Sequence, residues 1–269
     1  MPRFGGVLLI MPKKPTIYIQ GAGLAGLTAG IYLQKNDYPV IIYEKNHDVG
    51  TRFRGDLQGL ENWSEKADIL DELNEAGIDV NFECYPGYKI HVLNTVTQST
   101  VSGKRPVNYL VKRGSFEGSL DYSLKHQFLQ AGGKIYFQCE NPPQMPHIIA
   151  TGPLFQAVPG MVKGIIFQCN LPDCQYILFN DVLAYKGYSY FLVANGYACL
   201  SSVIMHEMQR APACFEATLH FFSEYLNISI INSNVIGGVG SFNFQPSWIK
   251  GNSLIVGEAA GMQDFLWGF

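Results

Sequence analysis

The sequence is poor in charged residues, and neither sign of charge dominates. Only 15% of its 269 residues are charged, with 19 basic and 22 acidic residues and a net charge of −3. No stretch forms a basic stripe of the kind that follows a phosphate backbone. The composition therefore argues against nucleic acid as a partner.

The cysteines lack the spacing of a metal site or a redox motif. None of the six belongs to a CxxC pair, and no histidine stands at zinc-ligand spacing from them. The closest pair, Cys169 and Cys174, is separated by four residues that include a proline. We therefore expect free thiols in a reducing compartment, a cytoplasmic location and no bound metal.

A long apolar stretch suited to a membrane span is missing as well. The N-terminal segment, residues 1–16, has an apolar core of only five residues, which is too short for a signal peptide or a span. The one long uncharged window, residues 187–205, contains Asn195-Gly196 between two β-rich runs. That dipeptide is the strongest short hairpin signal, so we predict a β-hairpin there. Peripheral contact with a membrane stays open.

What the sequence does contain is a complete dinucleotide-binding βαβ unit. An apolar strand, residues 17–19, precedes the glycine-rich turn Gly21-Ala22-Gly23-Leu24-Ala25-Gly26. A helical pattern follows, and a second apolar strand, residues 40–43, completes the unit. Gly21 permits the tight turn, Gly23 lets the backbone approach a pyrophosphate, and Gly26 lets the helix pack closely. The N–H groups of Leu24 and Ala25, with the helix dipole behind them, then face the phosphates.

Glu44 ends the second strand, 23 positions after Gly21. A carboxylate at this place accepts hydrogen bonds from the adenosine ribose, and its charge disfavours a 2′-phosphate. The unit by itself leaves NAD and FAD both open. A glycine-rich loop in a non-binding α/β domain is the alternative interpretation.

The rest of the chain alternates helix and strand patterns and then becomes β-rich after Gly164. Helices are predicted near residues 64–76, 118–130 and 213–226. Strands are predicted at residues 89–96, 108–112, 134–139, 147–150, 165–169, 176–179 and 253–256. A nucleotide-binding domain interrupted by a sheet domain is the most economical arrangement.

Three further motifs follow the βαβ unit. The first is a loop, residues 49–54, that contains Gly50 and Arg52. The second is Arg113-Gly114-Ser115-Phe116, which leads into a predicted helix. The third is the strand 253–256 with Gly257-Glu258-Ala259-Ala260-Gly261 after it, where small residues at a helix start allow close approach of a ligand.

Together these motifs resemble the flavoprotein oxidoreductases of the para-hydroxybenzoate-hydroxylase class, and within it the geranylgeranyl-reductase-like branch, over about residues 15–269. The resemblance implies that Arg52 helps to hold the diphosphate of FAD and that Arg113 lies near the ribityl chain. It also implies that Gly257 and Glu258 form the turn whose acid binds the ribityl hydroxyls, although the wider family usually has Asp there. A nicotinamide-only domain needs no second acidic turn, so Arg52 and Glu258 favour FAD.

The chain also departs from that class. Residues 149–152, Ile-Ala-Thr-Gly, occupy the place where aromatic hydroxylases carry Asp-Gly, which argues against a hydroxylase. The stretch between Cys139 and His147 is too short for the β-meander common in the class. The chain ends at Phe269, inside what we expect to be a continuing helix, so we expect a C-terminally truncated member.

The predicted fold is therefore α/β, a Rossmann-like FAD-binding domain of residues 15–87, 113–156 and 246–269. A β-rich substrate domain, residues 88–112 and 157–245, is inserted into it. We expect hydride transfer to or from a small apolar, isoprenoid-like substrate, with NAD(P)H or another electron donor. The alternatives are a flavin-dependent monooxygenase and a non-catalytic FAD-binding remnant. The sequence identifies no catalytic residue.

Overall fold

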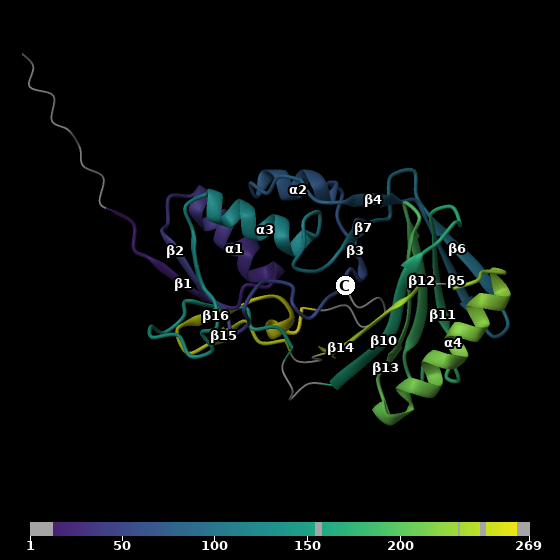
Figure 1. The fold of residues 1–269 in the computed structure, drawn as a ribbon. Helices are drawn as coiled ribbons and strands as arrows, with labels where there is room; N and C mark the ends of the chain where they lie inside the picture. The colour runs from purple at the N-terminus through teal and green to yellow at the C-terminus, as the bar shows by residue number, and fades with distance from the viewer. Residues whose placement is uncertain (1–12, 154–157, 231, 243–245, 263–269) are drawn as a thin grey trace, which may run out of the picture.

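The computed structural model describes residues 13–153, 158–230, 232–242 and 246–262. Two main parts lie next to each other, a six-stranded sheet with helices on one face and a seven-stranded sheet with a long helix on its outer face (Figure 1). A smaller, three-stranded sheet lies between them (Figure 1).

The six-stranded sheet has the order β15-β16-β9-β1-β2-β8. Its strands are β1 (Ile17–Gln20), β2 (Val40–Tyr43), β8 (Lys134–Tyr136), β9 (Ile148–Ile149), β15 (Ile249–Lys250) and β16 (Ser253–Ile255). All neighbours pair in parallel except β15 and β16. Strand β1 therefore lies in the middle, and its carboxyl end opens at the place where parallel α/β sheets bind ligands.

Helices α1 (Leu24–Lys35) and α3 (Leu120–Gln130) cover one face of this sheet (Figure 1). Apolar side chains alternate along the strands, so Ile19 and Ile42 point toward these helices and are fully buried. A Cβ on Gly30 of α1 would lie 2.8 Å from the ring of Phe128 of α3, so this glycine sets how closely the helices pack. Ser119 caps α3 by accepting a hydrogen bond from Tyr122 N–H.

Helix α2 (Ile69–Glu75) is shorter than the predicted helix of residues 64–76. Its cap is Asp68, whose carboxylate accepts from Leu70 N–H at 3.0 Å. The segment before it is held as a loop because Arg105 donates hydrogen bonds to backbone carbonyls of residues 65–67. A tertiary contact thus overrides the local helix pattern.

The seven-stranded sheet has the order β14-β10-β13-β12-β11-β5-β6. Its strands are β5 (Lys89–Asn94), β6 (Gln98–Ser102), β10 (Val158–Gln168), β11 (Cys174–Phe179), β12 (Tyr188–Ala194), β13 (Tyr197–Ile204) and β14 (Asn234–Phe242). Helix α4 (Ala211–Tyr225) covers one face (Figure 1), where Phe215 and Phe222 pack with Phe191.

The long uncharged window forms the predicted β-hairpin. Strands β12 and β13 pair antiparallel around Asn195 and Gly196, which have φ angles of 49° and 75°. Two residues with positive φ are what a tight turn of the I′ type requires. Among the described residues, no helix combines the length and apolar composition that a membrane span needs.

The three-stranded sheet, in the order β3-β7-β4, consists of β3 (Leu57–Glu61), β7 (Asn108–Lys112) and β4 (Cys84–Gly87). It is tied to the seven-stranded sheet by a buried amide pair: Asn108 and Gln175 donate to each other at 2.8 and 2.9 Å. The strand at 108–112 thus belongs to this connecting layer, while β5 and β6 join the larger sheet. The domain boundaries remain a prediction, and the one at residues 156–157 lies outside the described residues.

Strand β16 leads into a short 3-10 turn, η2 (Gly257–Ala260), which ends at Gly261 in the left-handed conformation. Where we expected the start of an α-helix, residues 257–260 form a 3-10 turn. The expected helix up to Phe269 lies outside the described residues, as does most of the N-terminal segment considered above.

Candidate functional site

The glycine-rich turn follows β1 and has the backbone geometry that its glycines imply. Gly21 has a φ of 102°, and a Cβ there would lie 2.2 Å from the carbonyl oxygen of Ala150. A Cβ on Gly26 would lie 2.0 Å from the carbonyl oxygen of Gly21, so α1 packs directly on the turn. Gly23 differs, because nothing lies within 4 Å of the place of its Cβ. The turn therefore leaves open space beside Gly23.

Helix α1 begins at this open space without a side-chain cap. Its N-cap is Gly23, and no acidic residue lies in its first turn. The first N–H groups of the helix, those of Leu24, Ala25 and Gly26, therefore lie at the positive end of the helix dipole. A helix start of this kind binds phosphate groups through its backbone.

Glu44 lies buried at the end of β2, with only 7% of its surface exposed. Its Oε2 accepts a hydrogen bond from Ala22 N–H at 2.8 Å. Its Oε1 accepts from the backbone and the side chain of Asn46, at 2.9 and 2.6 Å. A carboxylate oxygen can accept two hydrogen bonds, so Oε2 can still accept one from a ribose hydroxyl. Its ribose role stays a prediction.

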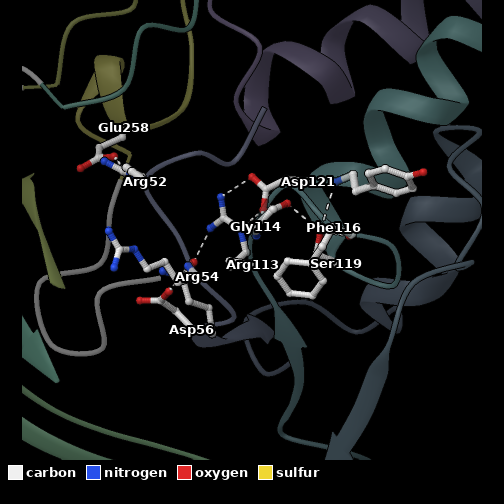
Figure 2. Close-up of polar contacts among 11 residues, drawn as sticks. Arg52, Arg54, Asp56, Arg113, Gly114, Phe116, Ser119, Asp121 and Glu258 are labelled. Carbon is white, nitrogen blue, oxygen red and sulfur yellow. Dashed lines mark hydrogen bonds and ion pairs between the residues drawn. The ribbon is translucent and has the colours of Figure 1, made fainter. Parts of the chain in front are cut away.

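The second acidic turn meets the start of α1. Gly257 has a φ of 63°, and a Cβ there would lie 2.6 Å from the Cβ of Ala25. Next to it, Glu258 Oε2 forms an ion pair with Arg52 Nη2 at 3.0 Å (Figure 2). Glu258 Oε1 accepts from Ser241 N–H at 3.1 Å. The structure thus gathers Arg52, Gly257 and Glu258 at the same end of α1.

Arg113 occupies a different, buried position. Its Nε and Nη2 donate to the two carboxylate oxygens of Asp121 at 2.8 and 2.9 Å (Figure 2). It also donates to Gln58 and lies over the ring of Phe53, 4.2 Å from the ring centroid. This network ties the end of β7 to the start of α3. The structure therefore shows a structural ion pair at Arg113, and a flavin contact stays a prediction.

A cavity of about 440 Å³ lies between the loop after β2 and the edge strand β14. Its volume lies in the range of small-molecule sites. Its lining comprises Thr51, Arg52, Arg54, Asp56, Val235, Ile236 and Gly237. Since Arg52 also reaches Glu258, the cavity adjoins the end of α1 described above.

Asp56 is the most unusual residue of this lining. It is a carboxyl residue with only 7% of its surface exposed, and its Oδ1 accepts from Arg54 N–H at 2.7 Å. Burial raises the pKa of the carboxyl above its ordinary value, although backbone hydrogen bonds and the charges of Arg113 and Arg52 act in the opposite direction. Within the described residues, no cation forms an ion pair with Asp56.

Neutral polar groups of the seven-stranded sheet lie behind Asp56. The hydroxyl of Tyr197 lies next to Gly55, where a Cβ would be only 2.5 Å from it. Burial raises the pKa of the Cys199 thiol to about 12, and burial likewise raises the pKa of Tyr190 and Tyr197. Phenol and thiol groups are neutral or negative, so they offer Asp56 no compensating positive charge.

Sequence reasoning assigned no role to Asp56, Asp121 or the cavity. The loop contains two arginines, Arg52 and Arg54. The sequence interpretation gave a role to Arg52 alone, although no local pattern shows which of the two faces a site. One signal was present: an arginine and an aspartate two positions apart, with a glycine between them. The partner of Arg113 could not be found because Asp121 reads as an ordinary residue of a helix first turn.

Comparisons with known proteins agree with this architecture. The family described as the NAD(P)-binding Rossmann-like domain matches residues 19–58. No curated protein sequence matches the chain.

Solved structures resemble nearly the whole chain at low sequence identity. A geranylgeranyl bacteriochlorophyll reductase-like protein from Thermoplasma acidophilum has a TM-score of 0.71 at 14% identity, over 93% of this chain and 72% of its own. The oxygenase of 2-methyl-3-hydroxypyridine-5-carboxylic acid has a TM-score of 0.63 at 15% identity, over 94% and 77%. The myxobacterial chondrochloren halogenase, an FAD-dependent halogenase, has a TM-score of 0.63 at 12% identity, over 93% and 70%.

The parallel sheet, the glycine-rich turn and these matches define the fold. The chain has a Rossmann-like nucleotide-binding fold combined with a β-rich part, and the predicted α/β fold class is confirmed.

Proposed function

We propose that the protein is an FAD-dependent oxidoreductase. The observation that carries the proposal is the meeting of two separate motifs, the glycine-rich turn and the Gly257-Glu258 turn, at the start of α1. One such turn suffices for the nucleotide half of a cofactor. A second turn with an acid, in contact with Ala25, supplies ligands for a further stretch of a long dinucleotide, as FAD is.

The residues present fit this cofactor. The open space at Gly23 and the uncapped N–H groups of Leu24 and Ala25 suit the diphosphate. Glu44 would hold the adenosine ribose, and Arg52 would neutralise phosphate charge. Glu258 would accept hydrogen bonds from the ribityl hydroxyls. Bound FAD supplies hydride chemistry, while the protein supplies position and polarity.

Arg113 has a narrower part in this proposal. Since Asp121 accepts from Nε and Nη2 of Arg113 and Gln58 accepts from Nη1, Arg113 would act toward the ribityl chain through the loop that it fixes. Direct contact requires a movement of this buried pair.

For the substrate, we propose an apolar, isoprenoid-like molecule that exchanges hydride with the flavin, with NAD(P)H as the electron donor. Val235 and Ile236 provide an apolar wall in the cavity. On the same sheet face as Ile236, the rings of Tyr190 and Tyr197 pack into an apolar cluster. The likeness to a geranylgeranyl bacteriochlorophyll reductase-like protein supports this choice.

A flavin-dependent monooxygenase is the second candidate. It is favoured by the likeness to an oxygenase and a halogenase of comparable TM-score. It is opposed by Ala150-Thr151-Gly152, which stand where the hydroxylases carry Asp-Gly. Oxygen consumption coupled to formation of an oxygenated product would favour this candidate over the first.

The proposal is tested by purifying the chain and titrating it with FAD. We expect a yellow protein with bound flavin that is reduced by light under anaerobic conditions and reoxidised by polyprenyl compounds. A colourless protein that takes up no added FAD would contradict both candidates. Reoxidation by oxygen alone, with no polyprenyl compound reduced, would contradict the isoprenoid substrate.

A further inference from the structure

The cavity beside β14 carries an unusual set of charges. Arg54 lines it with an exposed side chain, and among the described residues its guanidinium forms no ion pair or hydrogen bond. Arg52 lines it too, but its charge is matched by Glu258 at 3.0 Å. Among the residues that the structure describes, Arg54 is therefore a cation of the cavity without a charged partner.

Asp56 is the second polar group of the cavity that lacks a side-chain partner. Only backbone N–H groups, those of Arg54 and of Asp56 itself, hydrogen-bond to its carboxylate among the described residues. Arg54 contributes through its backbone, so its guanidinium remains available to a ligand. Figure 2 shows both side chains extending from the same loop.

The groups that face Asp56 come from three elements. The loop contributes Arg52, the end of β7 contributes Arg113, and strands β12 and β13 contribute uncharged Tyr190, Tyr197 and Cys199. Both arginines are bound to other carboxylates, Glu258 and Asp121. Burial favours uptake of a proton by Asp56, while backbone hydrogen bonds and the charges of Arg113 and Arg52 oppose it.

These charges select a class of ligand. Once Asp56 has taken up a proton, and with Arg52 matched by Glu258, Arg54 leaves one positive charge, which a single negative charge balances. A phosphate dianion would need a second cation. A carboxylate fits in two ways, since its planar pair of oxygens matches a guanidinium and also accepts a hydrogen bond from a protonated carboxyl.

We propose that this cavity binds a carboxylate ligand between the Arg54 guanidinium and an Asp56 carboxyl that takes up a proton on binding. The apolar part of the ligand lies against Val235 and Ile236. The inference rests on the proposed function in one respect, because the carboxylate would be the head group of its apolar substrate. The charge argument itself does not involve FAD.

The test is isothermal titration calorimetry of the whole chain, with and without added FAD. The three probes are geranic acid, geraniol and geranyl monophosphate, which have the same isoprenoid skeleton and differ in head group. We expect geranic acid to bind at least about tenfold more tightly than geraniol, because a charge-assisted hydrogen bond is lost in the alcohol. Titration in two buffers of different ionisation enthalpy measures the protons taken up, and we expect a net uptake with geranic acid.

Two variants separate the roles of the side chains. Arg54→Gln should weaken geranic acid binding about tenfold or more and leave geraniol unaffected. Asp56→Asn should abolish proton uptake and keep most of the affinity, since its amide still donates a hydrogen bond. The matched controls are Arg210→Gln and Asp181→Asn, which change exposed residues paired with Glu207 and Lys186.

Several outcomes would overturn the proposal. Equal binding of acid and alcohol, tighter binding of the phosphate, or binding of the acid without proton uptake would each do so. Because proton uptake is measured on the unchanged protein, this test does not depend on folding of the variants. If the protein binds FAD but not geranic acid, the carboxylate site is contradicted and the proposed function stands. If it binds geranic acid but not FAD, the proposed function is contradicted and the carboxylate site stands.

Discussion

Arg52 and Glu258 stand 206 positions apart in the chain, and their side chains meet in an ion pair of 3.0 Å. The loop after β2 and the turn after β16 are thereby joined at the start of α1. The same carboxylate accepts a hydrogen bond from Ser241 of β14, so one side chain contacts both main parts of the molecule. Glu258 therefore connects the nucleotide end of the site with the wall of the cavity.

Replacement of Arg52 should affect cofactor binding more than stability. Arg52→Gln should weaken FAD affinity about tenfold, because a charge-assisted contact to phosphate is lost. The Arg52 side chain is 46% exposed, so the free energy of unfolding should change by less than about 1 kcal/mol. Flavin fluorescence titration and urea unfolding measure the two effects. Arg210→Gln is the matched control, and unchanged FAD affinity in Arg52→Gln would remove Arg52 from the site.

Two glycines of the turn, Gly26 and Gly23, should differ in whether their replacement affects stability or FAD binding. Gly26→Ala places a Cβ 2.0 Å from a backbone carbonyl and should destabilise the protein by about 2 kcal/mol or more. Gly23→Ala meets nothing within 4 Å, so stability should change by less than about 1 kcal/mol while FAD binding is lost. Thermal unfolding with and without FAD distinguishes these effects. Gly238→Ala, which also meets nothing within 4 Å, should change neither property.

The buried pair of Arg113 and Asp121 should be a main source of stability near the site. Asp121 is 1% exposed, and Asp121→Ala would leave the Arg113 charge buried without its partner. We expect a loss of about 3–5 kcal/mol in the free energy of unfolding. Urea unfolding measures the loss, and Asp181→Ala removes one carboxylate of an exposed pair as control. A loss no larger than that of the control would show that Arg113 is not held by Asp121.

The raised pKa of Asp56 predicts that Asp56→Asn is more stable than the unchanged protein at neutral pH. An acid whose pKa is higher in the folded state than in the unfolded chain binds protons more readily when folded, so stability falls as pH rises through this interval. Asp56→Asn removes that loss and still accepts from Arg54 N–H. The variant should therefore melt at a higher temperature than the unchanged protein at neutral pH.

The difference should shrink toward acid pH, where Asp56 is protonated in both states. Asp181→Asn is the contrasting control, because hydrogen bonds from Lys186 lower the pKa of Asp181. Its effect should have the opposite sign, with lower stability at neutral pH. Melting curves over a pH series decide the matter, and a constant difference between Asp56→Asn and the unchanged protein would contradict the raised pKa.

Local patterns were sufficient for much of the fold. The alternation of apolar residues, the turn glycines and the Asn195-Gly196 pair are set by neighbours in sequence, and the structure confirms the elements they predict. The start of α2 at Ile69 was missed because Arg105, far along the chain, holds the preceding segment as a loop.

The site was predictable only in part, for the same reason. The geometry of the glycine-rich turn follows from consecutive residues, whereas the partner of Arg52 comes from an element 206 positions away. A sequence pattern identifies Arg52 as a candidate but does not pair it with Glu258. Burial of Asp56 depends on the packing of the sheet behind it, which no local pattern describes.

The order of strands in the parallel sheet has a consequence for how the chain folds as it is made. Strand β9 lies between β1, near the start of the chain, and β16, near its end. At a synthesis rate of about 5–20 residues per second, roughly 5–20 s separate the appearance of β9 from that of β16. During that interval one edge of β9 has unpaired backbone groups, which favour association with other strands. We therefore expect the nascent chain to be more prone to association until β16 emerges.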